Sequence, residues 1–367
     1  MMFAPWFARS FTAAAVILAV LVPVRAYAAE PVISEQTVLQ SDFWTEMPPL
    51  PEGISGHRAV LAGRAIIVLG GRNRAGASQK SVFAAPVRGN GTLGDWKKSP
   101  DLPFALSGHA AVECGGVVYV CGGYRLGDKA DIMSNQVIYG EPGKDGIIRQ
   151  WKEAASLPMR VHSHGIAAYD GRVYIAGGYT PAGCVSSVLV GETGKGGGIA
   201  SWGQTLSLPT PLYNIAVTTI GRYLVVIGGQ SPAEGKTLTV PTAYVGPIWK
   251  DGSITTWYLA SSKLPANWLS FGRSKSSAVA YGNAIFCFGG QDAMWFPVNS
   301  VAYVSFDSEK GEMGEWAVMP RNDNMQELTE AISWKDNVYL VGGVKRGLAT
   351  AQVLRGKFAV IKREEPQ

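Results

Sequence analysis

The chain has 367 residues, a formal net charge of +5 and 47% apolar residues, with 45 glycines and 21 prolines. This composition is typical of a turn-rich, all-β protein. The positive charge is small and spread along the chain, which argues against a nucleic-acid partner. Beyond the first residues, no segment approaches the length of an apolar membrane span, so we expect no membrane insertion of the mature chain.

The first 28 residues have the features of a secretory signal. Arg9 provides the positively charged start, an apolar stretch runs over 13–24, and Ala26-Tyr27-Ala28 is a small-x-small cleavage site. The sequence therefore predicts a signal peptide at 1–28 and a single domain at 29–367. The mature chain is expected to be periplasmic or secreted.

A repeat of tryptophans and glycine pairs follows the signal. Five tryptophans each precede a Gly-Gly pair by 26 residues, and a further unit, from Trp257 to Gly289-Gly290, needs 32 residues. The five tryptophans are Trp44, Trp96, Trp151, Trp202 and Trp316, and their glycine pairs begin at Gly70, Gly122, Gly177, Gly228 and Gly342. A fixed period of this kind indicates a repeat architecture.

The second unit shows what one repeat contains. Short strands are expected at 107–114, 117–121, from 136 onward and at 147–151, with tight turns at Gly115-Gly116 and at residues 144–146. Four antiparallel strands cannot bury both faces of a sheet alone, but six such sheets around an axis can. We therefore predict an all-β, six-bladed β-propeller. The strand around Phe43-Trp44 should complete the last blade, which otherwise lacks its outer strand.

The repeat resembles that of kelch proteins over nearly all of the mature chain. The resemblance rests on the six glycine pairs after apolar strands, on the tyrosines in Val118-Tyr119, Val173-Tyr174 and Val338-Tyr339, and on the late tryptophan of each unit. Among exported bacterial kelch propellers, the chain is most similar to the sialic-acid mutarotase (N-acetylneuraminate epimerase) group. This resemblance implies a sugar ligand and an isomerase that works by acid/base catalysis.

The acid/base residue of that group is not matched. The group has a glutamate just after a blade's glycine and an arginine six residues later, whereas this chain has Gln230 and Lys236. Glutamine cannot exchange a proton as glutamate does. Glu234, Glu327 and Glu330 are candidate replacements, and Glu234 with Lys236 is the predicted catalytic pair.

The loops that follow the second and fourth strands of each unit should share one face, and here they are long and polar. Function on a rigid scaffold is usually carried by such loops. Aromatic rings beside polar groups suit a sugar; the alternative is that Trp268 only packs its long loop. The predicted substrate-binding residues are Gln230, Trp268, Arg273, Asp292, Trp295 and Glu327.

Three of the four histidines, His57, His109 and His164, lie 13 residues before a Gly-Gly pair. A repeated position favours a structural role, such as holding a strand end by hydrogen bonds. His162 and His164 alternate onto one side of a strand, but no third ligand accompanies them. No metal or other cofactor is expected.

Two questions stay open at this point. Export permits disulfides among Cys114, Cys121, Cys184 and Cys287, in three full connectivities, and buried free thiols are the alternative. The protein binds and epimerises a small sugar, or it is a non-catalytic scaffold for a protein or glycan partner. A carboxylate and an Arg or Lys that converge at the mouth of the central channel would favour an enzyme.

Overall fold

The computed structural model describes eight segments of the chain. These are residues 33–40, 44–126, 131–233, 235–241, 243–260, 272–298, 300–319 and 328–364. All of their regular structure is strand, and they include no helix long and apolar enough to cross a membrane. The predicted signal at 1–28 lies outside these residues. Nearly all of the described strands belong to one compact unit, Glu35–Lys362.

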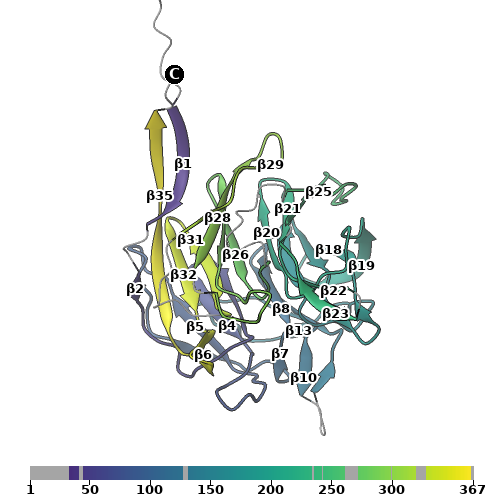
Figure 1. Ribbon diagram of the computed structural model, residues 1–367. Coiled ribbons are helices and arrows are strands. Elements are labelled where there is room, and N and C mark those ends of the chain that lie inside the picture. Colours follow the sequence, from purple (N-terminus) through teal and green to yellow (C-terminus); the bar gives the residue numbers. More distant parts are fainter. Residues whose placement is uncertain are drawn as a thin grey trace, which may run out of the picture. The chain divides into compact units, whose positions relative to one another are not determined.

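Six antiparallel sheets follow one another along the chain (Figure 1). The first four sheets each have four strands. They are β3 (Arg58–Ala62), β4 (Ala65–Leu69), β5 (Val82–Pro86) and β6 (Lys97–Ser99); β8 (Ala110–Cys114), β9 (Val117–Cys121), β12 (Val137–Gly140) and β13 (Lys152–Glu153); β14 (Gly165–Tyr169), β15 (Arg172–Ala176), β18 (Val188–Thr193) and β19 (Ile199–Thr205); and β20 (Ala216–Ile220), β21 (Tyr223–Ile227), β24 (Ala243–Pro247) and β25 (Tyr258–Leu259).

The last two sheets have five strands each. The fifth contains β26 (Ser277–Tyr281), β27 (Ala284–Phe288), β28 (Val301–Asp307), β29 (Glu312–Met313) and β30 (Ala317–Val318). The sixth contains β31 (Glu330–Trp334), β32 (Asn337–Val341) and β35 (Val353–Glu364), and both β1 (Ile33–Leu39) and β2 (Thr45–Glu46) pair with β35.

Small additional ladders form in the loops between the strands of the main sheets. They are β7 (Leu106–Ser107) with β10 (Tyr124–Leu126) and β11 (Asp131–Met133), β16 (Tyr179–Thr180) with β17 (Gly183–Cys184), β22 (Gln230–Ala233) with β23 (Lys236–Thr239), and β33 (Val344–Lys345) with β34 (Leu348–Ala349).

The second strand of each sheet is buried on both faces, which explains its continuous apolar sequence. In β9, Val118 and Val120 pack with Ile67 of the preceding sheet. The alternate residue Tyr119 packs with residues of the following sheet, such as Val173. Because side chains alternate across a strand, one strand contributes to two inter-sheet cores. The core of the protein therefore lies between neighbouring sheets.

The first strands of the sheets contact one another in sequence order. β3 contacts β8, β8 contacts β14, β14 contacts β20, β20 contacts β26, β26 contacts β31, and β31 contacts β3 again. The first and last repeats also meet elsewhere. Thr45 of β2 pairs with Arg355 of β35, and the Tyr339 hydroxyl donates to the carbonyl of Gly91 over 2.7 Å.

The glycine pairs join one repeat to the next. The second glycine of each of five pairs donates its backbone N–H to a loop carbonyl of the following repeat; Gly123 donates to Val161 over 2.8 Å and Gly343 donates to Ile54 over 2.8 Å. A Cβ on Gly123 would lie 2.6 Å from the Cβ of His109 in the same repeat. The pair therefore needs glycine both for its positive φ and for the close approach of two strands.

The outer strand of the second repeat begins later than the sequence predicted. In the second repeat, β13 comprises Lys152–Glu153, whereas the prediction placed this strand at 147–151. Ile148 instead makes an isolated bridge with Pro142, and Trp151 lies over Gly140, where a Cβ would come within 3.3 Å of the indole. The tryptophan thus packs on the third strand before the outer strand starts. Its indole N–H donates to the carbonyl of Pro100 over 3.3 Å.

Candidate functional site

Six residues at one repeated position surround the mouth of a cavity. Each lies 14 residues before a Gly-Gly pair, and each has a φ between 50° and 60°: Gly56, Gly108, Ser163, Asn214, Lys275 and Leu328. Backbone hydrogen bonds connect them between repeats. Ser163 donates to Gly108 over 2.9 Å, Asn214 donates to Ser163 over 2.8 Å, and Lys275 donates to Asn214 over 2.8 Å. We call these six residues the mouth ring.

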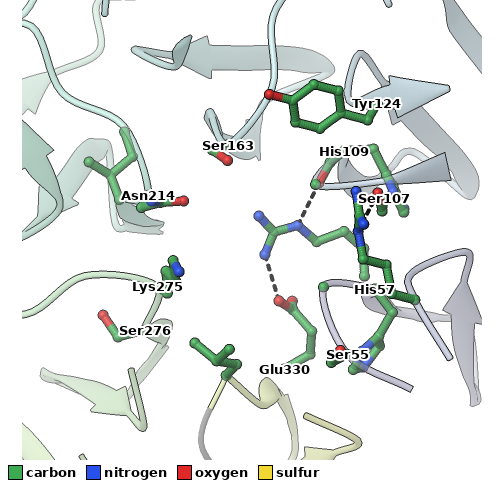
Figure 2. A pocket seen from close by; sticks show the side chains of 16 residues that line it. Ser55, His57, Ser107, His109, Tyr124, Ser163, Asn214, Lys275, Ser276 and Glu330 are labelled. Atoms are coloured by element: carbon green, nitrogen blue, oxygen red, sulfur yellow. Dashed lines mark hydrogen bonds and ion pairs between the residues drawn. The ribbon is translucent and has the colours of Figure 1, made fainter. Parts of the chain in front are cut away.

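The cavity has a volume of about 310 Å³ and is lined by residues of all six repeats. Its charged lining residues are Arg58, Arg72, Lys275 and Glu330. Figure 2 shows Ser163, Asn214 and Lys275 on one side of the cavity and Glu330 on the other. Among the described residues, three cationic side chains and one anionic side chain therefore surround a space large enough for a small ligand.

Arg58 and Glu330 form an ion pair between the first and last repeats. Arg58 Nη1 donates to Glu330 Oε1, and Arg58 Nε donates to the carbonyl of His109 over 2.9 Å. Burial raises the pKa of Glu330, and the Arg58 guanidinium partly offsets this rise. A second cavity of about 120 Å³ shares both residues and is otherwise lined mainly by small and apolar side chains. The pair thus separates the two cavities.

A hydrogen-bonded group of three side chains forms part of the wall. The Tyr124 hydroxyl and His162 Nε2 are 2.9 Å apart, and His162 Nδ1 and Ser163 Oγ are 2.9 Å apart. Tyr124 and Ser163 both line the cavity. Burial lowers the pKa of His162 to about 4, so the imidazole is neutral at neutral pH.

Lys275 is half-buried at the mouth ring. Burial lowers the pKa of its ammonium group. The Lys275 Nζ lies 5.4 Å from the centre of the Trp295 ring, within cation–π distance. Among the described residues, no carboxylate forms an ion pair with Lys275. Its charge is therefore available to an anion in the cavity.

The three repeated histidines have a structural role, as their spacing predicted. His57 Nε2 donates to the carbonyl of Val341 over 3.1 Å, which joins the first repeat to a strand end of the last. His109 and His164 lie beside Gly70 and Gly122, as His57 lies beside Gly342, but no hydrogen bond from their ring nitrogens is seen within the described residues. Burial lowers the pKa of all three imidazoles to about 3, so they stay neutral.

The predicted binding residues that the structure describes, Gln230, Arg273, Asp292 and Trp295, are not among the residues that line this cavity. Gln230 is buried, and its Oε1 accepts a hydrogen bond of 2.7 Å from Asn214 Nδ2, so it supports a member of the mouth ring. Arg273 is buried and donates to the carbonyls of Cys287 and Ser300 over 3.3 and 3.2 Å. Lys236 is exposed on β23.

Asp292 and Trp295 belong to one turn. Asp292 Oδ1 accepts the backbone N–H groups of Met294 and Phe296, each over 2.9 Å, and thereby shapes this turn. Trp295 is 52% exposed and reaches Lys275 through the cation–π contact. Glu234, Trp268 and Glu327 lie outside the described residues.

Sequence reasoning missed most of the lining residues. Glu330 was a candidate replacement base, but Arg58, Ser163 and Lys275 received no role. The sequence did contain a signal for these residues. Each lies at a fixed distance before a Gly-Gly pair, and at the same distance other repeats have glycine, alanine or another residue type. A polar side chain at a repeated position where other repeats have a different residue type therefore indicates the cavity.

The structure also answers the question of the cysteines. All four are free thiols, and Cys114, Cys121 and Cys287 are buried. Burial raises the pKa of Cys287 to about 12, so this thiol is protonated and inert at neutral pH. In the described part of the chain, no group of three His, Cys, Asp or Glu side chains is placed to hold a metal ion.

Comparisons with known proteins support the fold. No protein-family model matches the chain. It is 26% identical over 207 residues to Kelch-like protein 40 of Mus musculus, covering 56% of this chain and 31% of that protein. It is 31% identical over 157 residues to Kelch-like protein 35 of Mus musculus, covering 42% and 24%, and 25% identical over 217 residues to Beta-scruin of Limulus polyphemus, covering 57% and 22%.

The chain thus spans less than a third of the length of these relatives. The solved structure of YjhT superimposes with a TM-score of 0.66 at 13% identity, covering 86% of this chain and 99% of that one. The kelch relatives and the repeated sheets of this structure indicate the same fold: the chain is a kelch-type β-propeller.

Proposed function

We propose that the protein binds a small acidic sugar in the cavity inside the mouth ring. The observation that carries this proposal is the charge of Lys275, which lines the cavity and forms no ion pair with a described carboxylate, while the described carboxylate of the lining, Glu330, is already paired with Arg58. A sugar carboxylate would pair with Lys275 through a charge-assisted hydrogen bond. The hydroxyl and amide groups of Tyr124, Ser163 and Asn214 suit the sugar's own hydroxyls.

The proposal includes a closed, six-bladed architecture. The six sheets would be the blades, and β2 would complete the last blade by pairing with β35. The contact of β31 with β3 and the hydrogen bond from Tyr339 to Gly91 support this closure. Closure is what brings Arg58 to Glu330, which lies 272 residues away in the sequence.

Exchange of the sugar's anomers is the reaction we propose for this cavity. The reaction needs a proton donor and a proton acceptor near the ring oxygen and the anomeric hydroxyl. An Arg and a Glu converge in the cavity, and the sequence resembles the exported sialic-acid mutarotase group. Export is also part of the proposal, and N-terminal sequencing of the mature protein should begin at Ala29.

Isothermal titration calorimetry tests the binding. The sugar N-acetylneuraminate should bind, and the neutral N-acetylmannosamine should bind at least about tenfold more weakly, since a lost charged contact is worth about 1.4 kcal/mol or more. Lys275→Asn should weaken binding of the acidic sugar alone. Asparagine suits the positive φ of this position and occurs at the matched Asn214. Equal affinity for both sugars would contradict the proposal.

A second candidate function is a scaffold for protein partners. Apolar side chains are exposed on the loop ladders and on the turn after β27: Leu126, Ile132, Leu238, Met294, Trp295, Phe296 and Leu348. The similarity to Kelch-like proteins and scruin is compatible with such a role. If no sugar binds and a partner captured from the exported fraction is lost with Phe296→Ala, the scaffold is favoured.

A further inference from the structure

We propose that Tyr124, His162 and Ser163 form a proton relay that opens into the cavity at both ends. The inference rests on the proposed function, because it assigns the proton transfer on the bound sugar to these three residues. The two hydroxyl groups line the cavity, and the imidazole connects them through two hydrogen bonds of 2.9 Å.

The fold holds the three side chains in place. Ser163 is part of the mouth ring, and its φ of 54° is fixed by its hydrogen bond to Gly108. Tyr124 follows the glycine pair of the second repeat at the start of β10. His162 makes a backbone bridge with Tyr179, and its ring lies 4.2 Å from the Tyr124 ring centre and 5.6 Å from that of Tyr179. The imidazole is thus packed between two tyrosines.

A neutral imidazole has one protonated nitrogen and can bind the two hydroxyls in either of two ways. In one state, Nδ1–H donates to Ser163 and the phenol donates to Nε2. In the other state, Ser163 donates to Nδ1 and Nε2–H donates to the phenol. Conversion of the first state to the second moves the phenol proton to Nε2 and the Nδ1 proton to Ser163 Oγ.

During the same conversion, the relay gives one proton to the bound sugar and takes one proton from it. As Ser163 Oγ receives the Nδ1 proton, it releases its own proton into the cavity, and Tyr124 Oη takes one proton from the cavity. One group of the bound sugar loses a proton while another gains one, directly or through one water. No side chain ends with a changed charge. Ring opening and closure of an acidic sugar at its anomeric centre require this pair of transfers.

The repeat comparison separates this group from the structural histidines. His57, His109 and His164 share one offset, whereas His162 lies two residues before His164, at an offset where the other five repeats have Ser55, Ser107, Tyr213, Ser274 and Glu327. An imidazole occurs at this offset only in the third of these repeats. Its neutral state at neutral pH is the one that a relay requires.

NMR exchange spectroscopy of N-acetylneuraminate anomers tests the relay, with calorimetry for binding. Tyr124→Phe and Ser163→Gly should each reduce the catalysed exchange rate at saturating sugar at least tenfold, a loss that is additional to the weaker binding (higher Kd) caused by the lost hydroxyl contact. The glycine keeps the positive φ and occurs at the matched Gly56 and Gly108. The double variant should be no slower than the slower single variant, because the residues act as a unit. Tyr179→Phe is the control and should retain the wild-type rate.

The outcomes distinguish the two proposals. If the sugar fails to bind the wild-type protein, the proposed function is wrong. If it binds and the exchange rate survives Tyr124→Phe and Ser163→Gly, the relay is wrong. A readout without sugar is the ¹⁵N NMR signal of His162, which should show two tautomers in exchange in the wild type and one dominant tautomer in Tyr124→Phe. A single fixed tautomer in the wild type would overturn the relay whatever the ligand.

Discussion

At the residue scale, the buried histidines show how a repeat makes a polar side chain part of the core. His57 is buried and donates to the carbonyl of Val341 in the neighbouring repeat. In the fourth repeat, Ile215 occupies the same offset and packs into the core. The position therefore needs bulk more than charge. The neutral imidazole is tolerated because burial keeps its pKa low.

This low pKa makes the stability depend on pH. The folded pKa of His57, His109 and His164 is about 3, below the usual 6.5 of the unfolded chain, so the unfolded state binds more protons as the pH falls below 6.5. Each group should lower the free energy of unfolding by about 2 kcal/mol between pH 8 and pH 5. Urea unfolding at these two pH values measures the loss.

The variant that checks this prediction is His109→Ile, which introduces the residue that the fourth repeat has at Ile215. It should unfold with a smaller loss of free energy between pH 8 and pH 5 than the wild type, by about one histidine's share, or about 2 kcal/mol. The loss is measured relative to the variant's own free energy of unfolding at pH 8. A packing defect that lowers the stability equally at both pH values therefore cancels. An unchanged pH dependence would show that His109 does not titrate on unfolding as described.

At the element scale, the glycine pairs determine how closely two strands approach. Gly123→Ala places a methyl group 2.6 Å from the Cβ of His109 at a φ of 91°. Gly116 in the adjacent turn has a φ of 85°, and a Cβ added there would meet nothing within 4 Å. Gly116→Ala should cost about 1–2 kcal/mol of stability, from backbone strain alone. Gly123→Ala should cost at least about 2 kcal/mol more, through overpacking.

Chemical denaturation of both variants measures the difference. Since their φ values are nearly equal, the comparison isolates the steric contact between strands. Equal losses of stability would mean that the pair recurs in the repeats for its backbone conformation only, and that neighbouring side chains move aside at little cost.

The elements also show what the sequence could predict. The glycine pairs, the buried tyrosines and the tryptophans have local physical causes, and they repeat, so the order of the first three strands was predicted correctly. The outer strand of the second repeat was misplaced because Trp151 packs on the third strand before the outer strand starts, which spacing does not reveal. The cavity was missed because its residues come from all six repeats. Arg58 and Glu330 meet only through contact of the first and last repeats.

At the scale of the whole molecule, the contact between the last and first repeats decides whether the cavity is closed. Its hydrogen bond from Tyr339 to the carbonyl of Gly91 is 2.7 Å long, and the equivalent bond between the third and fourth repeats runs from Tyr174 to Gly252 over 3.0 Å. Both hydroxyls are buried, and burial raises the pKa of both tyrosines to about 12. The two interfaces are therefore built alike.

Tyr339→Phe and Tyr174→Phe make a matched pair that tests the closure. Each variant leaves a buried carbonyl without its hydroxyl donor, so each should lose about 1–3 kcal/mol of unfolding free energy in urea. Similar losses are expected because both interfaces have to open for the chain to unfold cooperatively. If Tyr339→Phe had no effect while Tyr174→Phe destabilised the protein, the last and first repeats would be apart in solution. The ion pair between Arg58 and Glu330, and with it the cationic cavity, would then not persist.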